Sequence, residues 1–107
     1  VAPDWSLYEG LDMSNPAAYG ASKGGLLQLT RWLASVFAPD VRVNLVGPGG
    51  ISRHQVSEFT GRYVGRTLLN RMACEDDVVA GVVFMLGNGS GYVTGTELRC
   101  DGGYSVV

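Results

Sequence analysis

Charged residues are few in this sequence, and neither sign dominates. Asp, Glu, Lys and Arg make up 17% of the 107 residues, against 46% hydrophobic residues, and the formal charge is −2. A composition this apolar excludes a disordered chain and is typical of a single α/β domain with a modest core. Because Lys and Arg are nowhere clustered, the sequence offers no basic surface for nucleic acid.

Long apolar runs and closely spaced metal ligands are also missing. No stretch is long enough to span a membrane and the start does not resemble a signal peptide, so we expect no membrane association. Cys74 and Cys100 have no His or Cys at ligand spacing. We interpret them as buried thiols in a reducing compartment, by default the cytoplasm, rather than as a disulfide or metal pair. The carboxylates of Glu75, Asp76 and Asp77 suit the first turn of a helix, which explains them without a metal.

The clearest helix signal lies in the first third of the chain. Asn15 followed by Pro16 is a strong start, with an asparagine that can cap free N–H groups and a proline at the first helical position. Apolar residues recur at helical spacing as far as Phe37, and the Pro-Asp pair at 39–40 ends the pattern. We predict a helix over 16–37, and its wide apolar surface indicates burial on more than one side.

Residues 1–14 show no hydrophobic periodicity and are expected to be loop. Four further elements follow the helix along the chain. The β-branched run "VRVNLV" predicts a strand over 41–46. Residues 52–71 carry a weak helical pattern interrupted by glycines, which we interpret as a mobile segment or lid. Acidic residues open a helix predicted over 75–87, which ends at "GNG", and "TELRC" predicts a last strand over 96–100.

The order of these elements predicts an α/β fold with a parallel sheet. Two strands joined through helices pair in parallel, with a right-handed crossover. An apolar parallel strand normally has neighbours on both sides, and strand 41–46 has only one here. We therefore expect residues 1–107 to form one partial domain of a larger fold.

Tyr19 and Lys23 stand four residues apart, on one face of the predicted helix. A free phenol has a pKa of about 10 and is no base at neutral pH. An ammonium about 4 Å away would favour the phenolate by on the order of 4 kcal/mol at an effective dielectric near 20, which lowers that pKa toward neutrality. Small residues around the pair would let a ligand come close. The spacing suits proton exchange with an alcohol or carbonyl oxygen, although it also occurs by chance as an exposed pair without function.

The motifs "YGASKGGLLQLTRWLA", "VRVNLVGPGGI" and "YVTGTELRCDGGY" follow one another in the chain. With them the chain resembles the short-chain dehydrogenase/reductase family over about residues 15–104. The resemblance implies the C-terminal part of a Rossmann-type parallel sheet, with about two parallel strands, flanking helices and the N-terminal half of the fold absent. It also implies NAD or NADP as cofactor, a secondary alcohol or ketone as small-molecule substrate, and association into a homo-oligomer or with the missing half.

The resemblance assigns roles to five residues. Tyr19 would be the catalytic acid/base. Lys23 would lower the pKa of Tyr19 and bind the ribose hydroxyls of the nicotinamide half. Pro48, Gly49 and the backbone of Ile51 would sit against the nicotinamide, so that all five count as cofactor-binding residues.

Three weaker candidates would face the substrate. The variable substrate-binding lid would span 52–71 and contains Arg53 and His54. Arg53 stands where many family members carry a threonine that contacts the cofactor, and it would meet a phosphate or an acidic substrate, or face solvent. His54 would face a substrate or be a solvated lid residue. The family's substrate-binding serine lands on Ser6, unless an insertion places it upstream of Val1.

A dinucleotide site also needs a glycine-rich turn between a strand and a helix, and this chain has none. The comparable pattern "GNGSG" at 87–91 follows a helix instead. We therefore expect a segment of an NAD(P)-dependent oxidoreductase that is inactive alone. One alternative is a truncated, inactive remnant that only self-associates through the strand edge at 41–46 and its apolar helix faces. Another is a proteolytic product of a longer enzyme.

Overall fold

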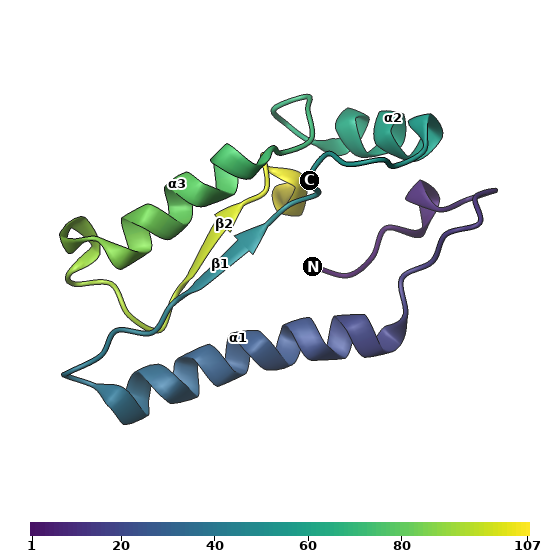
Figure 1. The fold of residues 1–107 in the computed structure, drawn as a ribbon. Helices are drawn as coiled ribbons and strands as arrows, with labels where there is room; N and C mark the ends of the chain where they lie inside the picture. Colours follow the sequence, from purple (N-terminus) through teal and green to yellow (C-terminus); the bar gives the residue numbers. More distant parts are fainter.

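Two parallel strands lie at the centre of the structure, with one helix on either face (Figure 1). The computed structural model describes residues 1–107. Strand β1 spans Leu45–Pro48 and strand β2 spans Glu97–Cys100. Helix α1, Ala17–Phe37, runs along one face of this pair, and helix α3, Glu75–Leu86, runs along the other. The predicted α/β fold with two parallel strands and flanking helices is confirmed.

Strand β1 lies further along the chain than the prediction of 41–46. Backbone pairing with β2 begins with Leu45 opposite Glu97. Before that point the two segments are joined largely by side chains. The Val43 N–H donates to Thr94 Oγ1 at 3.1 Å, and the Thr96 N–H donates to Asn44 Oδ1 at 3.2 Å. Together with one backbone bond, from the Gly95 N–H to the Val43 carbonyl at 2.8 Å, these side-chain bonds stand in place of a regular ladder, so the β-branched run is only partly strand.

Helix α1 begins one residue later than predicted, and its predicted cap is wrong. Pro16 is the N-cap, with an extended backbone at ψ 143°, and no side chain caps the helix. Asn15 therefore lies one residue too early to reach the free N–H groups, and its Oδ1 is buried without a hydrogen-bond partner. The other end of α1 lies at Phe37, next to the predicted Pro-Asp stop.

Helix α3 is anchored at its start by a carboxylate. Asp77 accepts the Cys74 N–H at 2.8 Å and two guanidinium bonds from Arg71 at 2.6 and 2.7 Å. The Arg71 bonds, followed by those from Cys74, hold the pKa of Asp77 well below its usual range. Cys74 occupies the N-cap position at the surface, so the expectation of a buried thiol is wrong there, while Cys100 is half-buried and both thiols are free.

Helix α2, Ser57–Arg66, occupies the middle of the predicted lid and is the best-packed element of the chain. Its Phe59 and Tyr63 form the hydrophobic core with Leu7 and Met72. The residues expected to be loop contribute to this core, because Trp5–Leu7 forms a short 3-10 helix with Leu7 buried. The glycines that interrupt the helical pattern of α2 face open space, so they do not break the helix.

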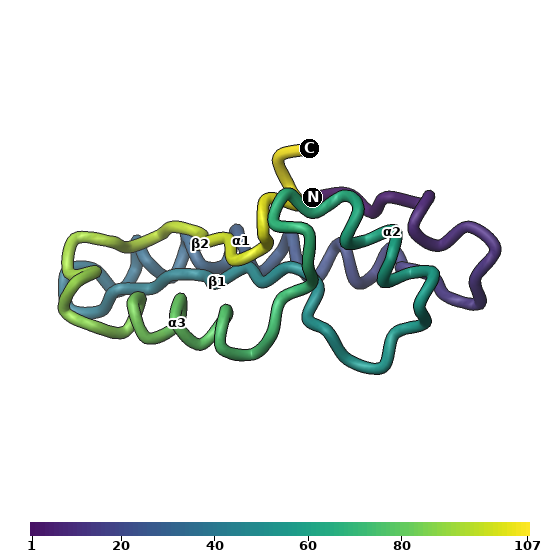
Figure 2. The backbone as a smooth tube through the Cα atoms, turned by 90° about the horizontal axis from the view of Figure 1, so that it is seen from above, coloured from purple at the N-terminus to yellow at the C-terminus, as the bar shows by residue number.

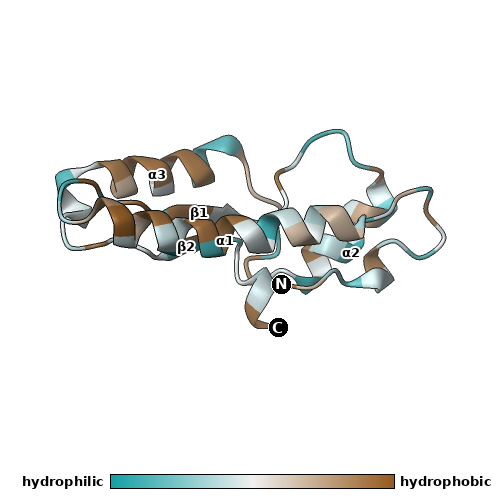
Figure 3. Ribbon diagram, turned by 90° about the horizontal axis from the view of Figure 1, so that it is seen from below, coloured by the Kyte–Doolittle hydropathy of each residue, from teal (hydrophilic) through white to brown (hydrophobic).

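The two faces of the sheet region are far less covered. Seen from above, the chain is elongated, with the sheet and α3 at one end, α2 with the N-terminal segment at the other, and α1 running along most of the length (Figure 2). Hydrophobic residues cover α3 and much of α1 (Figure 3), and several on α1 and α3 are exposed, among them Trp32 at 58% and Leu86 at 78%. The accessible surface is 7206 Å², where a compact monomer of this mass exposes about 5,700 Å². The radius of gyration is 15.7 Å, against about 13 Å for a compact domain of this length.

Candidate functional site

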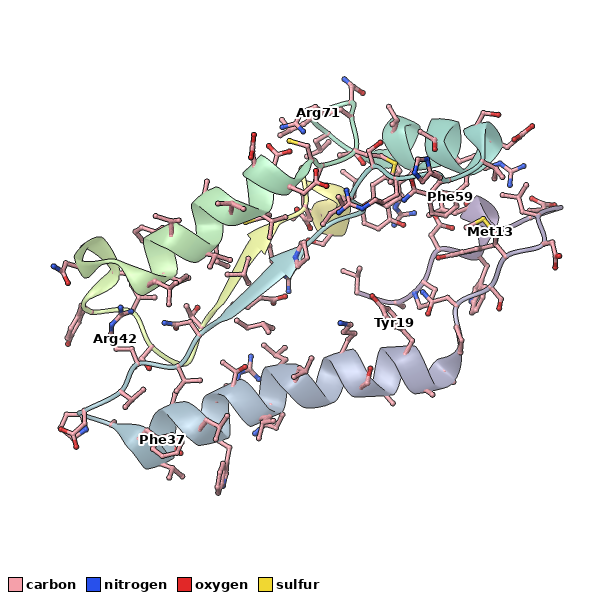
Figure 4. All side chains as sticks on the ribbon, in the orientation of Figure 1. Met13, Tyr19, Phe37, Arg42, Phe59 and Arg71 are labelled. Atoms are coloured by element: carbon pink, nitrogen blue, oxygen red, sulfur yellow. The ribbon has the colours of Figure 1, made fainter.

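Tyr19 and Lys23 lie together near the start of α1. Their i, i+4 spacing stacks the two side chains, and Lys23 Nζ is 5.3 Å from the centroid of the Tyr19 ring. The ammonium thus lies over the ring, within the range of a cation–π contact, and no hydrogen bond joins it to the phenol oxygen. Tyr19 is 53% exposed and projects from α1 on the side where the strands and α2 lie (Figure 4).

The helix surface around this pair is open. A Cβ atom added at Gly20, Gly24 or Gly25 would meet no heavy atom of the chain within 4 Å. The Ser22 hydroxyl donates to the Tyr19 carbonyl at 2.8 Å and so is turned toward the backbone. The helix is therefore uncovered at these glycines, and the Tyr19 side chain is itself 53% exposed.

The turn Pro48–Ile51 lies at the carboxyl end of β1. This is the edge at which parallel α/β sheets bind their ligands. The Gly49 N–H donates to the Cys100 carbonyl at 3.0 Å, and the Gly50 carbonyl accepts the Ala73 N–H at 2.9 Å. Pro48 is exposed, whereas Gly49 and Ile51 are half-buried. The turn is thus fixed by hydrogen bonds to two other segments and presents Pro48 to the outside.

Both glycines of this turn are required by packing within the chain. A Cβ at Gly49 would stand 2.8 Å from the Asp101 Cα, and one at Gly50 would stand 2.8 Å from Tyr63 Cζ and 3.0 Å from Met72 Cε. Real Cβ atoms do not approach neighbours so closely. The close contact with α2 explains these glycines without any ligand.

Arg53 is engaged by a neighbouring carboxylate. Its guanidinium pairs with Glu75 at the start of α3, and its backbone N–H donates to Gln55 Oε1 at 2.6 Å. The first-turn N–H of Glu75 itself, followed by Arg53, lowers the pKa of Glu75. Both partners are more than half exposed, so the pair adds little stability. The neighbouring His54 lies on an exposed bend and makes no hydrogen bond.

Ser6 lies in the short helix packed on α2. Its hydroxyl donates to Asp4 Oδ1 at 2.7 Å, and its N–H donates to the same oxygen at 3.0 Å. Asp4 in turn pairs with Arg66 of α2. These bonds tie the Ser6 segment to α2, and no interaction joins Ser6 to Tyr19.

A cavity of about 440 Å³ lies beside the same turn. Its wall includes Gly50, Tyr63 and the turn after β2. Leu68 and Leu69 also line it, as do the charged residues Arg71, Asp77 and Arg99, while Tyr19 and Lys23 do not take part.

Sequence reasoning did not single out Tyr63 as a site residue, because it appeared there only as one apolar position in a weak pattern. Its partners are distant in sequence, at Gly50 and Tyr104. Its position thirteen residues beyond Gly50 carried no signal of its own.

Comparisons with known proteins identify the family. The family model described as "Enoyl-(Acyl carrier protein) reductase" matches residues 6–105, nearly the whole chain. The chain belongs to the short-chain dehydrogenase/reductase family, as the three motifs predict.

Individual relatives agree with this assignment. The chain is 42% identical over 93 residues to the short-chain dehydrogenase/reductase SDRA of Arabidopsis thaliana, covering 81% of this chain and 37% of that protein. It is 35% identical over 107 residues to a cyclopentanol dehydrogenase of Comamonas testosteroni, covering 94% and 43%. The crystal structure of a short-chain dehydrogenase from Leptospira borgpetersenii with bound NAD+ superposes with a TM-score of 0.84 at 39% identity, covering 92% and 41%. The chain thus spans about two fifths of the length of the relatives it matches.

None of the helices combines the length and the apolar character needed to cross a membrane. No three His, Cys, Asp or Glu side chains are grouped so that they could hold a metal ion.

Proposed function

We propose that this chain forms the catalytic and nicotinamide-facing part of an NAD- or NADP-dependent oxidoreductase that interconverts a secondary alcohol and a ketone. The observation that carries the proposal is the placement of Lys23 over the Tyr19 ring on an open helix surface. Membership of the family supports it, as does the NAD+ bound to the relative from Leptospira borgpetersenii.

The residues around the turn fit a nicotinamide cofactor. Tyr19 is exposed on α1, and Pro48, Gly49 and Ile51 stand at the carboxyl end of a parallel strand. These five residues would hold the nicotinamide half of NAD or NADP. When bound, the cofactor supplies the hydride acceptor or donor.

Tyr19 would exchange the proton of the substrate hydroxyl. In the direction of oxidation, the phenolate accepts that proton while the hydride leaves the substrate carbon, and in reduction the phenol returns it. The Lys23 ammonium lies over the Tyr19 ring, 5.3 Å from its centroid. Its three N–H donors also suit the ribose hydroxyls of the cofactor.

We assign the segment 52–71 to the substrate side of the site. His54 is exposed and free of hydrogen bonds, so it can meet a substrate. Arg53 would first have to leave Glu75, and Ser6 would have to release Asp4. His54 is therefore the better candidate of the three.

Both thiols are free, which supports a reducing compartment, the cytoplasm by default.

The remaining strands of the sheet would come from an N-terminal half of the fold or from further copies of the chain. Strand β1 pairs only with β2, so its other edge carries no neighbour. The surface in excess of a compact monomer amounts to about 1,500 Å², the area of a standard protein–protein interface. Exposed apolar residues of α1 and α3 contribute to this surface, and large exposed apolar patches mark interaction sites.

A second candidate is an inactive protein that acts only by self-association. The exposed apolar residues of α1 and α3 favour this alternative, because two copies could cover each other's helices. Sedimentation of the purified chain distinguishes the two. A concentration-dependent dimer without cofactor binding supports self-association alone, and a monomer at all concentrations removes it.

The proposal is tested by titrating NADH and NADPH into the purified protein while following energy transfer from its tryptophans. Saturable binding supports the proposal, and flat curves for both the 107-residue chain and the complete gene product contradict it. A panel of secondary alcohols and ketones then identifies the substrate. The Tyr19→Phe variant separates catalysis from binding, because it removes only the hydroxyl.

A further inference from the structure

Tyr63 reaches from the lid helix α2 to the turn after β1. The Gly50 N–H donates to the Tyr63 phenol oxygen at 2.5 Å, and Tyr63 is only 7% exposed. We propose that Tyr63 is a positioning residue, which holds the backbone of Gly49, Gly50 and Ile51 and thereby couples the lid to the nicotinamide-facing side of the site. This inference rests on the proposed function of that turn.

The phenol completes the hydrogen bonding of the turn. The Gly49 N–H and the Gly50 carbonyl both have backbone partners, in Cys100 and Ala73. The Gly50 N–H has no backbone acceptor and is bound by the Tyr63 side chain instead. Because a buried N–H without an acceptor is unfavourable, loss of the phenol oxygen would loosen this part of the turn first.

The phenol itself is held firmly in place. The Tyr63 ring stacks on the Tyr104 ring, with centroids 4.6 Å apart and planes at 7°, and lies 6.0 Å from the Phe59 ring. The Arg66 guanidinium lies over the outer ring, 5.1 Å from the Tyr104 centroid. Burial, the largest cause, raises the pKa of Tyr63, so that the group stays a neutral phenol.

Tyr63 packs tightly between helix α2 and the turn after β1. A Cβ at Gly49 would lie 3.1 Å from the Tyr63 oxygen, and one at Gly50 would lie 2.8 Å from its Cζ. A movement of α2 by even an ångström would therefore displace the turn or break the hydrogen bond. Residues 52–71 form the proposed substrate side. Substrate binding that moves α2 would therefore also move the turn, because Tyr63 connects the two.

The test compares Tyr63→Phe with Tyr104→Phe in the complete gene product. Tyr63→Phe keeps the stacked ring and removes the only acceptor of the Gly50 N–H. Tyr104→Phe is a matched control, because it removes a hydroxyl from the other stacked ring that makes no hydrogen bond. In Tyr63→Phe we expect the Gly50 amide to exchange with solvent about tenfold faster and the Kd for NADH or NADPH to rise about five- to tenfold. The control should leave both values within twofold of wild type.

Two results would overturn the inference. One is a Gly50 amide that exchanges at the wild-type rate in Tyr63→Phe. The other is faster exchange with an unchanged cofactor Kd, because the turn would then be held for reasons unrelated to the cofactor. If Tyr63→Phe does not fold, wild-type exchange decides: the inference requires a Gly50 amide as protected as that of Ala73, and an unprotected one refutes it.

Failure of the proposed function would look different. Wild-type protein would then bind neither NADH nor NADPH and turn over no alcohol or ketone, and the coupling to a cofactor would be refuted with it. Gly50 exchange would still report whether Tyr63 holds the turn.

Discussion

Replacing Gly50 with alanine would press a methyl group against the side chains that fasten α2 to the turn. The new Cβ would stand 2.8 Å from Tyr63 Cζ and 3.0 Å from Met72 Cε, where carbon atoms normally rest about 3.5–4.0 Å apart. Met72 can turn its flexible end away. The Tyr63 ring cannot retreat, because it is stacked on Tyr104 at 4.6 Å.

We expect Gly50→Ala to lower the free energy of unfolding by about 1–3 kcal/mol, the usual cost of overpacking a core. In a protein as long as the relatives of this chain, each kcal/mol lowers Tm by roughly 2–4 °C, so that Tm falls by about 2–12 °C. Thermal unfolding of the complete gene product, followed by circular dichroism or calorimetry, measures this change.

Gly61→Ala is the matched control, with the opposite sign. Gly61 lies inside α2, and a Cβ added there meets nothing within 4 Å. Alanine in a helix interior is favoured over glycine by about 0.5–1 kcal/mol, so Tm should rise slightly. A Gly50→Ala variant as stable as wild type, or a Gly61→Ala variant that loses as much as Gly50→Ala, would refute the packing of α2 on the turn.

Three further predictions follow from the site and from the start of α3. Tyr19→Phe should reduce turnover of the complete enzyme by at least about 100-fold with an unchanged Kd for NADH; turnover within threefold of wild type contradicts its role. Because the pKa of Asp77 is lower in the folded chain than in the unfolded one, its pairing with Arg71 stabilises the fold above about pH 4 and ceases to do so as pH falls further. Asp77→Asn should therefore destabilise more at pH 7 than at pH 2, where the folded carboxylate still keeps part of its pairing, and an equal loss at both rules the pairing out. Exposed Cys74 should react with a thiol reagent in the folded protein well before half-buried Cys100, and equal rates would contradict the burial.

Periodic patterns predicted the long helices well. The apolar spacing that ends before Pro39 describes α1, and the acidic start with the glycine stop describes α3 within a residue. Both signals are local, because they depend on residues within a few turns of each other. The cap was wrong for an equally local reason: Pro16 took the capping position, and Asn15 was left outside.

The sheet and the core were harder to predict, since their partners are distant in sequence. Asn44 bonds to the backbone of Thr96, and this pairing decides where β1 starts. The weak pattern of α2 gave no sign that Tyr63 would meet Gly50 and Tyr104. That Tyr19 and Lys23 lie together could be predicted from their spacing of four residues on one helix, but not that Lys23 lies over the ring instead of beside the phenol oxygen.

The two halves of the proposed nicotinamide pocket are supported very differently. The turn at Gly50 is fastened by Tyr63 from the only well-buried cluster, whereas α1 buries just Thr30 and Ala34 among its 21 residues. The orientation of Tyr19 toward the turn must then depend on whatever covers the apolar faces of α1. A cofactor that touches both Tyr19 and the turn would bind the covered form best, and by mass action would stabilise it. Cofactor binding and assembly are therefore expected to strengthen one another, with the apparent Kd for NADH falling as protein concentration rises.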